Sequence, residues 1–467
     1  MRYRGRNTHR ASRASLIVAS AVLTSVAFAG TTASAQTSMA AKHGHVTLSV
    51  LMERQSNPTV ATAQTKFLSQ ITAQFEKEYP YISLKISTYP GSPATTIDTM
   101  VASHQGPNVM EVGTTFIPTL TATGAFVPWS KSMLADVGIN NIVGAATRMD
   151  GVQGKAPVGI PDSAQPFALW YNKAMFAKAG IAGPPKTWSE FLSDAERLTH
   201  PSQGVYGAAI APADPFYSMH TTWLLSRQNG GQVIDSSGNK ALFASPKVAS
   251  EVQFYLDWLS KYHIVAPSDV QFQEAEAITA FVDGKAAMVP VGGLYDLGEI
   301  DLTASKAFLV KDLGVAPNPV IPFGESKTPS GGLATPSFVS GQEQAIFKYG
   351  TSPAQVSAAV NWIHFYTSVP VQVRLPRLFG TLPINKSAYA APYLKTPVWK
   401  MFETIESEST PTPRVAGWLD LPTTYDAAMA TVFDDVTLGK YHAGELSTTL
   451  ASVDSQIDTT LASLSAP

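Results

Sequence analysis

The order of its apolar patterns limits how this chain can fold more than any other feature of the sequence. Apolar and polar residues alternate over residues 46–50 and again over 82–86, which is the spacing of a half-buried β-strand. Between these segments apolar residues recur every four positions from Phe67 to Phe75, which predicts an amphipathic helix. A second helix and a short apolar strand over 109–112 follow. This β-α-β-α-β order predicts an α/β architecture with a mainly parallel sheet.

A second run of strand and helix patterns follows later in the chain. An apolar strand is predicted over 167–171, and Thr187 with Glu190 forms a capping box that starts a helix. Further strands are predicted over 205–210 and 286–291. The chain has 467 residues, and domains usually have about 100–200. Two α/β runs in a chain of this length therefore predict two domains.

The first 35 residues have the three parts of a secretory signal peptide. Five arginines without any acidic residue precede a short apolar run over residues 16–30, and Ala33-Ser34-Ala35 then fits a cleavage site. The run is shorter than the ~20 apolar residues that a membrane span needs, and without a twin arginine it favours general secretion. We therefore expect residues 1–35 to be a signal peptide and the mature protein to be exported.

Charge and cysteine content exclude several classes of function. The whole chain has 33 basic and 35 acidic residues, and because five arginines lie in the signal, the mature protein is mildly acidic. Nucleic-acid binding would require a basic face instead. The absence of cysteine excludes disulfides, thiolate metal sites, cysteine nucleophiles and a lipid-carrying cysteine at the mature start. We expect a periplasmic or extracytoplasmic protein that is soluble and not lipid-anchored.

Seven short motifs of the mature chain occur in an order that is known from one protein family. They are Phe75–Pro80, Gly106–Val109, Gly124–Pro128, Tyr171–Lys173, Pro184–Phe191, Ala280–Met288 and Leu382–Ala388. In this order they resemble the family 1 extracellular solute-binding proteins of ABC transporters, the maltose-binding-protein-like group. The resemblance extends over nearly the whole mature chain.

The resemblance implies a fold: an α/β, two-lobed periplasmic-binding-protein fold (type II-like) with a ligand cleft between the lobes and hinge crossovers. The expected N-terminal lobe comprises residues 43–163 and 314–340, and the expected C-terminal lobe comprises residues 164–313 and 341–467. The expected crossings between the lobes lie near 163–167, 311–316 and 337–341. Lobes of this kind close around a ligand by hinge motion.

The resemblance also implies a function. The chain would be the extracytoplasmic substrate-binding component of an ABC importer. It would be a monomer that binds a mono- or oligosaccharide between its lobes and delivers it to the permease subunits in the membrane. Neither catalysis nor a cofactor is part of this role, and no nucleic acid is a partner.

Candidate ligand contacts lie in loops, because ligands of α/β sheets sit beyond the carboxyl ends of strands and at domain junctions. Carboxylates and arginine suit sugar hydroxyls, and flat aromatic side chains suit the apolar face of a sugar ring. The candidates of these types, with one loop glycine, are Glu53, Arg54, Phe116, Asp162, Phe216, Tyr295, Asp296, Gly332 and Trp418. In the family an aromatic residue commonly follows the strand of the Ala280–Met288 motif. Here Leu294 takes that place, and Tyr295 comes one residue later.

Two other interpretations stay open. The same fold could bind a non-sugar solute such as a glycerol phosphate, a polyamine, ferric iron or a peptide. A phosphate would use Arg54 and helix N-termini, a polyamine would use acidic residues between aromatic rings, and iron would use paired tyrosines.

A secreted glycoside-acting enzyme is the alternative of another class. It would use two carboxylates that are distant in the sequence, although the motifs G-x-S-x-G, H-E-x-x-H and the P-loop are absent. His43 and His45 in the leader and the segment 235–239 lack the pattern of a metal site, so no metal is expected.

Overall fold

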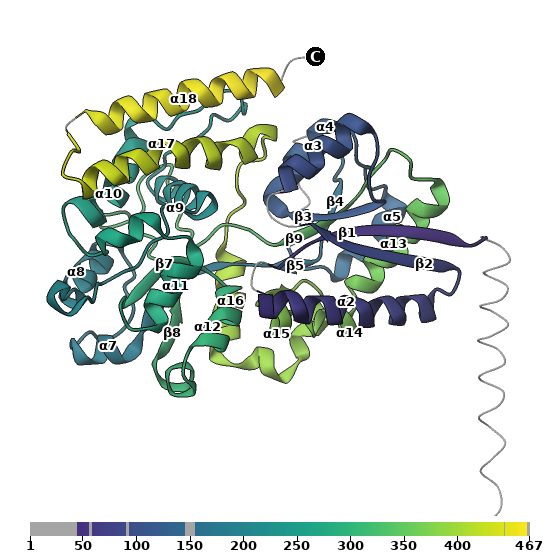
Figure 1. Ribbon diagram of the computed structural model, residues 1–467, viewed down its shortest axis with the longest axis horizontal. Coiled ribbons are helices and arrows are strands. Elements are labelled where there is room, and N and C mark those ends of the chain that lie inside the picture. The colour runs from purple at the N-terminus through teal and green to yellow at the C-terminus, as the bar shows by residue number, and fades with distance from the viewer. Residues whose placement is uncertain (1–43, 56–57, 90–92, 145–154, 443, 465–467) are drawn as a thin grey trace, which may run out of the picture.

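Two lobes lie side by side, each with its own β-sheet and surrounding helices (Figure 1). The computed structural model describes residues 44–55, 58–89, 93–144, 155–442 and 444–464, so the predicted signal peptide and His43 lie outside the described residues. The first lobe holds a five-stranded sheet and the second a three-stranded sheet. Of the helices in the described segments, none is long and apolar enough to cross a lipid bilayer.

The sheet of the first lobe has the strand order β2-β1-β3-β9-β4. Its strands are β1 Val46–Glu53, β2 Ile82–Tyr89, β3 Val109–Gly113, β4 Gly159–Pro161 and β9 Gln342–Ile346. β1 pairs in parallel with β2 and β3, whereas β9 runs antiparallel to β3 and β4. Alternate residues of β1 from Val46 to Met52 are buried, which is the period that predicted this strand. The first three predicted strands are therefore confirmed.

The helices of the first lobe pack on this sheet through apolar faces. They are α2 Pro58–Glu78, α3 Pro93–Ser103, α4 Ile117–Thr123, α5 Lys131–Asp136 and α13 Pro353–Tyr366. α2 buries Phe67, Ile71 and Phe75, which confirms its predicted amphipathic face. The ring of Phe75 contacts the rings of Trp362 and Phe365 at centroid distances of 5.5 and 5.4 Å, so α2 and α13 pack together.

The sheet of the second lobe has the order β7-β6-β8, with β6 Phe167–Asn172, β7 Met288–Gly293 and β8 Leu313–Ala316. β6 runs antiparallel to both neighbours, so the expectation of a mainly parallel sheet is wrong for this lobe. The order of strands and helices does not fix strand direction when a connection is long enough to return the chain either way. The prediction of a strand over 205–210 is also wrong. In this segment Val205 and Tyr206 form isolated β-bridges instead of a continuous strand.

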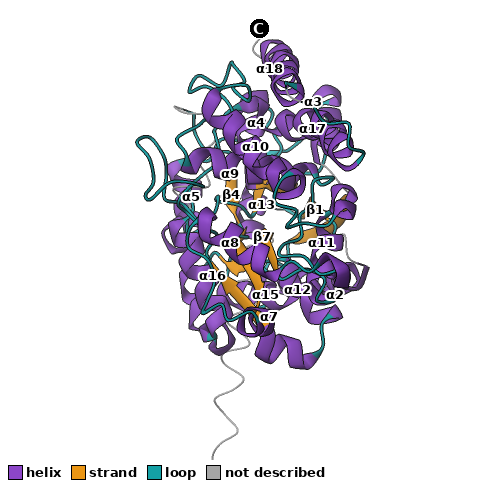
Figure 2. Ribbon diagram, turned by 90° about the vertical axis from the view of Figure 1, so that its left-hand side faces the viewer, coloured by secondary structure: helices purple, strands orange, loops and turns teal. Residues whose placement is uncertain are grey.

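Helices surround this second sheet (Figure 2). They are α7 Lys173–Lys178, α8 Trp188–Leu198, α9 Pro215–Gln228, α10 Pro246–Ser260, α11 Glu274–Val282, α12 Asp296–Thr303, α16 Pro397–Glu408, α17 Asp420–Thr437 and α18 Glu445–Leu464. The capping box of α8 is confirmed, because N of Glu190 donates to Oγ1 of Thr187 over 3.0 Å and the Glu190 carboxylate accepts from N of Thr187. The sequence does not predict α9. Nearly all of its residues are buried, including Ser218 and Ser226, so the helix lacks an amphipathic period.

The chain passes between the lobes at places that differ in part from the expected ones. It leaves the first sheet after Pro161 and enters the second sheet at Phe167. β8 pairs with β6, so residues 314–316 belong to the second lobe, and β9 pairs with β3, so β9 and the following α13 belong to the first. The expected lobe assignments of 314–340 and 341–467 are therefore corrected, since the return crossing lies between β8 and β9. Strand partners that are distant in the sequence decide this, and local patterns do not reveal them.

A third passage follows α13. The chain continues through α14 Val369–Gln372, α15 Leu375–Phe379 and β10 Leu382–Pro383, and β10 pairs with β5 Ser163–Ala164. It then reaches α16, which packs against β6 and β8 in the second lobe. The passages between the lobes therefore lie beside one another.

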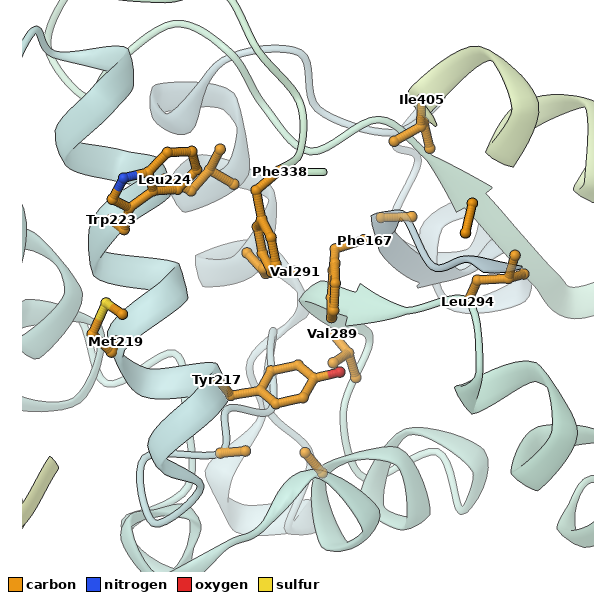
Figure 3. Packing of buried hydrophobic residues seen from close by; sticks show 14 of the residues in the cluster. Phe167, Tyr217, Met219, Trp223, Leu224, Val289, Val291, Leu294, Phe338 and Ile405 are labelled. Atoms are coloured by element: carbon orange, nitrogen blue, oxygen red, sulfur yellow. The ribbon is translucent and has the colours of Figure 1, made fainter. Parts of the chain in front are cut away.

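An aromatic stack fixes two of these passages to each other. Phe338, in the segment between β8 and β9, stacks on Phe167 at a centroid distance of 4.4 Å and on His220 of α9 at 4.6 Å. Figure 3 shows the rings of Phe167 and Phe338 next to each other, with Tyr217 nearby. N of Phe167 also donates a hydrogen bond to Oγ of Ser337 over 2.9 Å. The stack therefore joins the hinge to the second lobe.

Candidate ligand-binding cleft

A cleft of about 510 Å³ lies between the two lobes and takes residues from both. The first lobe contributes Glu53, Arg54, Gln55, Pro58, Pro93, Gly113, Thr115, Phe116 and Gln342; the passages contribute Gln165, Ser340 and Gly341; and the second lobe contributes Phe167, Phe216 and Tyr295. Its volume is that of a cleft for a small molecule, since such clefts measure about 300–1,000 Å³.

The cleft lies at the carboxyl ends of strands. Glu53 is the last residue of β1, Gly113 is the last residue of β3, and Tyr295 comes two residues after the end of β7. In open α/β sheets, ligands bind in the crevice outside these strand ends. The position of the cleft therefore follows from the topology of the two sheets.

The wall from the first lobe is polar and centres on Glu53. Oε2 of Glu53 accepts a hydrogen bond from Nε2 of Gln342 over 2.7 Å, and N of Glu53 donates to Oε2 of Glu111 over 3.0 Å. Burial raises the pKa of the Glu53 carboxyl above 4.5, while the hydrogen bond from Gln342 opposes this shift. Gln342 thus helps to keep a carboxylate facing the cleft.

Behind this wall Glu111 and Asp162 form a buried carboxyl pair. Both are almost fully buried, and Oδ2 of Asp162 accepts a hydrogen bond from Nε2 of Gln344 over 2.9 Å. Burial raises the pKa of Glu111 well above its usual range, and the neighbouring charge of Asp162 raises it further. Two carboxyl groups in such contact do not both ionise at neutral pH, so the pair holds a proton.

The wall from the second lobe is aromatic. Oη of Tyr295 donates to Oη of Tyr217 over 3.0 Å, and N of Gly293 donates to the same oxygen over 3.0 Å. The ring of Phe167 contacts those of Tyr295 and Phe216 at centroid distances of 6.1 and 5.8 Å. Burial, with the nearby carboxyls of Glu274 and Asp296, raises the pKa of Tyr295, so its hydroxyl stays protonated. Flat rings with a polar tip suit a ligand that has both apolar faces and hydroxyls.

An unusual backbone conformation directs the turn before Tyr295. Val291 in β7 has φ 56, although a β-branched residue rarely adopts a positive φ. The pairing of β6 with β7 is irregular next to it. N of Val291 donates to Oδ1 of Asn318 over 2.8 Å, which holds this conformation in place. Strain of this kind is often retained where a site needs it.

The structure brings five of the predicted contact residues together. Glu53, Arg54, Phe116, Phe216 and Tyr295 all line the cleft. Asp162 lies behind the wall of the first lobe instead. Ligand contact by each of the five stays a prediction.

Three further candidates lie outside the lining of the cleft, contrary to the positions expected for them. Asp296 begins α12 and is 3% exposed, close to the carboxyl of Glu274. Gly332 packs so closely on the carbonyl of Gln228 that a Cβ atom would lie 2.1 Å from it. Trp418 is fully buried, and its ring contacts those of His220 and Trp223. A position in a loop does not reveal such burial.

The sequence did not single out the amide and hydroxyl groups of the cleft. Gln55, Thr115, Gln165, Ser340 and Gln342 line it, and three of them lie in or beside the passages between the lobes. The predicted crossings near 163–167 and 337–341 were the available signal, because polar residues next to a crossing face the space between the lobes.

No group of three or more His, Asp or Glu residues in the described segments could hold a metal ion.

The chain is similar in sequence to known bacterial binding proteins. The family model described as bacterial extracellular solute-binding protein matches residues 61–373. The putative ABC transporter periplasmic-binding protein YcjN of Escherichia coli K12 is 24% identical, over 84% of this chain and 88% of that protein. The diacetylchitobiose binding protein DasA of Streptomyces coelicolor is 26% identical, over 47% of this chain and 49% of that protein.

A solved structure has the same fold. Maltose-bound MalE3 of T. maritima superposes with a TM-score of 0.72 and 20% identity, covering 89% of this chain and all (100%) of that one. This likeness confirms the predicted two-lobed α/β fold.

Proposed function

This chain belongs to the bacterial extracellular solute-binding proteins, and on that premise we propose that it captures a carbohydrate outside the cytoplasm for an ABC importer. The sugar binds in the cleft between the lobes, and the closed protein delivers it to the membrane permease. The observation that carries this proposal is the cleft itself, with a polar wall from one lobe and an aromatic wall from the other.

The chemistry of the two walls favours a sugar or a related polyol. Glu53 and Arg54 offer charge-assisted hydrogen bonds to hydroxyls, and the amide of Gln342 lies beside them. Phe216 and Tyr295 offer flat surfaces to the apolar side of a ring. The names of two similar proteins, which mention diacetylchitobiose and maltose, support the same ligand class.

We propose that Glu53, Arg54, Phe116, Phe216 and Tyr295 contact the ligand directly. They come from both lobes, so a ligand that touches all of them bridges the lobes. Such a ligand stabilises a closed arrangement by its higher affinity for that state. The passages around residues 162–166 and 317–341 would act as the hinge.

Capture without chemistry fits the cleft better than hydrolysis. A glycosidase needs two carboxyl groups on either side of the bond that it cleaves, about 5–10 Å apart. Glu53 is the single carboxylate among the described residues that line the cleft. We therefore propose a binding protein that works as a monomer, without a cofactor and without catalysis.

We also propose that residues 1–35 direct export and that the mature protein is free of a lipid anchor. Cell fractionation tests this part. The full chain should appear in the extracytoplasmic fraction and be released without detergent, whereas a chain that lacks residues 1–35 should stay in the cytoplasm. Retention of the full chain in the membrane fraction would contradict the proposal.

A thermal-shift screen tests the ligand class. The probes are mono- and oligosaccharides, alditols, glycerol phosphates, polyamines and amino acids. A true ligand at ~100 times its Kd adds about 2.7 kcal/mol to the free energy of unfolding. We expect a sugar or an alditol to raise the melting temperature of the wild type, and Glu53→Gln to reduce that shift. Glu196→Gln, an exposed change on α8, is the matched control.

The same screen separates the other interpretations. A shift by a glycerol phosphate that is lost in Arg54→Gln would replace the sugar by a phosphate. A shift by a polyamine alone would replace it by a cation. Release of product from any glycoside by the purified protein, abolished in Glu53→Gln, would contradict the proposal that the protein has no catalytic activity.

A further inference from the structure

A small polar recess opens behind the cleft wall of the first lobe. It encloses about 30 Å³, and it shares Gln55, Gln165 and Gln342 with the cleft. A cavity needs about 10–15 Å³ to hold one water molecule. The recess therefore has room for one or two non-hydrogen atoms that extend from a molecule in the cleft.

Two polar atoms of residues that line the recess have no hydrogen-bond partner among the described residues. They are Oγ1 of Thr381, in a residue that is 3% exposed, and Oε1 of Gln342. Nε2 of Gln342 already donates to Glu53. Unpaired buried polar atoms cost stability, so a recess that keeps them is suited to a group that arrives with the ligand.

The charged groups among the described residues that line the recess are acidic. The carboxyl pair of Glu111 and Asp162 lines the recess. The amide of Gln64 is occupied, because Nε2 donates to O of Glu53 over 2.6 Å and Oε1 accepts from N of Gln55 over 3.1 Å. Lysine, arginine and histidine are absent from the described lining. The recess thus disfavours an anion and favours a group that donates hydrogen bonds.

We propose that this recess is a subsite for one hydrogen-bond-donating terminus of the bound ligand, and that Thr381 helps to select it. In a carbohydrate this terminus is a primary hydroxyl, so the inference rests on the proposed function. A hydroxyl donates to Oε1 of Gln342 or to the carboxyl pair and accepts from Oγ1 of Thr381. The proton that the pair holds lets it serve as donor or acceptor.

The recess also lies where the lobes touch. Gly380, next to Thr381, has φ +60, and a Cβ atom there would lie 2.7 Å from Cα of Tyr295 in the second lobe. The segment that carries Thr381 therefore rests directly on the aromatic wall. A ligand group in the recess contacts a segment that depends on the position of the second lobe.

The test compares Thr381→Val with the wild type in titrations with D-glucose, D-xylose, maltose, D-mannitol and putrescine. Valine keeps the shape of threonine and removes its hydroxyl. We expect the melting temperature without ligand to stay the same or rise. Affinity for the sugars or alditols that bind should fall about three- to tenfold. D-Xylose, which lacks the hydroxymethyl group of D-glucose, should lose nothing. Thr381→Ser should restore the wild-type affinity.

Thr121→Val is the matched control. Thr121 is also buried, but its Oγ1 donates to O of Ile117 within α4, away from the cleft. We expect this variant to lose stability and to keep its affinity for ligand. The two variants thus separate a role in binding from a role in folding.

The outcomes distinguish the two proposals. If sugars bind the wild type and Thr381→Val equally well, the subsite is contradicted and the carbohydrate function stands. If putrescine alone binds and Thr381→Val weakens it, the carbohydrate function is contradicted, and the subsite stands with an ammonium group as the donor. If no probe binds the wild type, both proposals are contradicted.

Discussion

Gln342 and Glu53 are 289 positions apart in the chain, yet Nε2 of Gln342 donates a hydrogen bond to Oε2 of Glu53 over 2.7 Å. Glu53 ends β1 and Gln342 begins β9, where the chain returns from the second lobe. The hydrogen bond therefore ties a carboxylate of the cleft to a hinge passage. It also sets the charge of that carboxylate, because burial and the amide act on its pKa in opposite directions.

Replacing Gln342 by leucine should weaken ligand binding in mild acid by about tenfold or more, because Glu53 takes up a proton there and a hydrogen bond between the ligand and a charged carboxylate, which contributes about 1.5–3 kcal/mol, is lost. The variant removes the donor, so the pKa of Glu53 rises further above 4.5. Affinity that depends on the carboxylate is present above this pKa and is lost as pH falls through it. The loss should therefore begin at higher pH in Gln342→Leu than in the wild type, as isothermal titration at a series of pH values would measure.

Gln456→Leu, an exposed change on α18, is the control and should change neither affinity nor its pH dependence. Equal affinities of the wild type and Gln342→Leu at every pH would show that Glu53 does not bind the ligand as a carboxylate.

Two aromatic substitutions separate a cleft residue from a core residue. Tyr295→Ala removes a ring that lines the cleft and should lower sugar affinity about tenfold. Trp418→Phe shortens a fully buried side chain, so it should lower the melting temperature by several degrees and leave affinity within about twofold. Differential scanning fluorimetry and titration of the same samples give both quantities. A large loss of affinity in Trp418→Phe would restore Trp418 as a ligand residue.

The sequence predicted the elements whose signals are local. The apolar spacing of Phe67, Ile71 and Phe75 gives the buried face of α2, and the capping box of Thr187 and Glu190 starts α8. α9 escaped prediction because polar residues such as Ser226 are buried together with its apolar ones. Without a polar face, a helix has no period to detect.

Features that depend on distant pairing could not be predicted. Residues 313–316 belong to the sheet of the second lobe because they pair with Tyr171 and its neighbours in β6. Gln342 lies at the cleft because β9 pairs with β3. The rule that ligands sit beyond strand ends placed Glu53 and Tyr295 in the cleft, since both follow strands that were predicted. The same rule does not predict how deeply a residue is buried. Trp418 is fully buried and does not line the cleft.

Asn318 should prove one of the residues on which stability depends most. Oδ1 accepts from N of Val291, and Nδ2 donates to the carbonyls of Phe167 and Pro336. Asn318→Ala leaves these buried backbone groups unpaired and should cost about 3 kcal/mol or more in the free energy of unfolding. Urea denaturation measures this loss. Asn239→Ala, an exposed change in a loop, should cost little, and an equally small loss in Asn318→Ala would contradict the role of Asn318.

His220 should control stability in mild acid. It is 1% exposed, Nδ1 donates to the carbonyl of Phe216, and Nε2 has no partner within the described part of the chain. Burial among the rings of Phe216, Phe338 and Trp418 lowers the pKa of His220 from 6.5 to about 4. His220 therefore takes up a proton near pH 6.5 in the unfolded chain. In the folded protein it takes up this proton only near pH 4.

The sign of the effect follows from this difference. Above pH 6.5 neither state is protonated at His220, so the residue adds no pH dependence there. Between pH 6.5 and 4 the wild type loses stability as pH falls, by ~1.4 kcal/mol per pH unit from this group. His220→Phe cannot take up the proton, and a phenylalanine fits the stack with Phe338. The variant should match the wild type near neutral pH and exceed it by about 2–3 kcal/mol at the acid end of this range.

Urea denaturation of both proteins across this pH range measures the difference, in which the contributions of the buried carboxyls cancel. Gln456→Leu, the exposed change on α18, is the control and should follow the wild type across this pH range. Parallel curves for His220→Phe and the wild type below pH 6.5 would mean that His220 is protonated in the folded protein. Phe338 would then stack on a cation, and α9 would hold a buried charge against the hinge segment that carries Phe338.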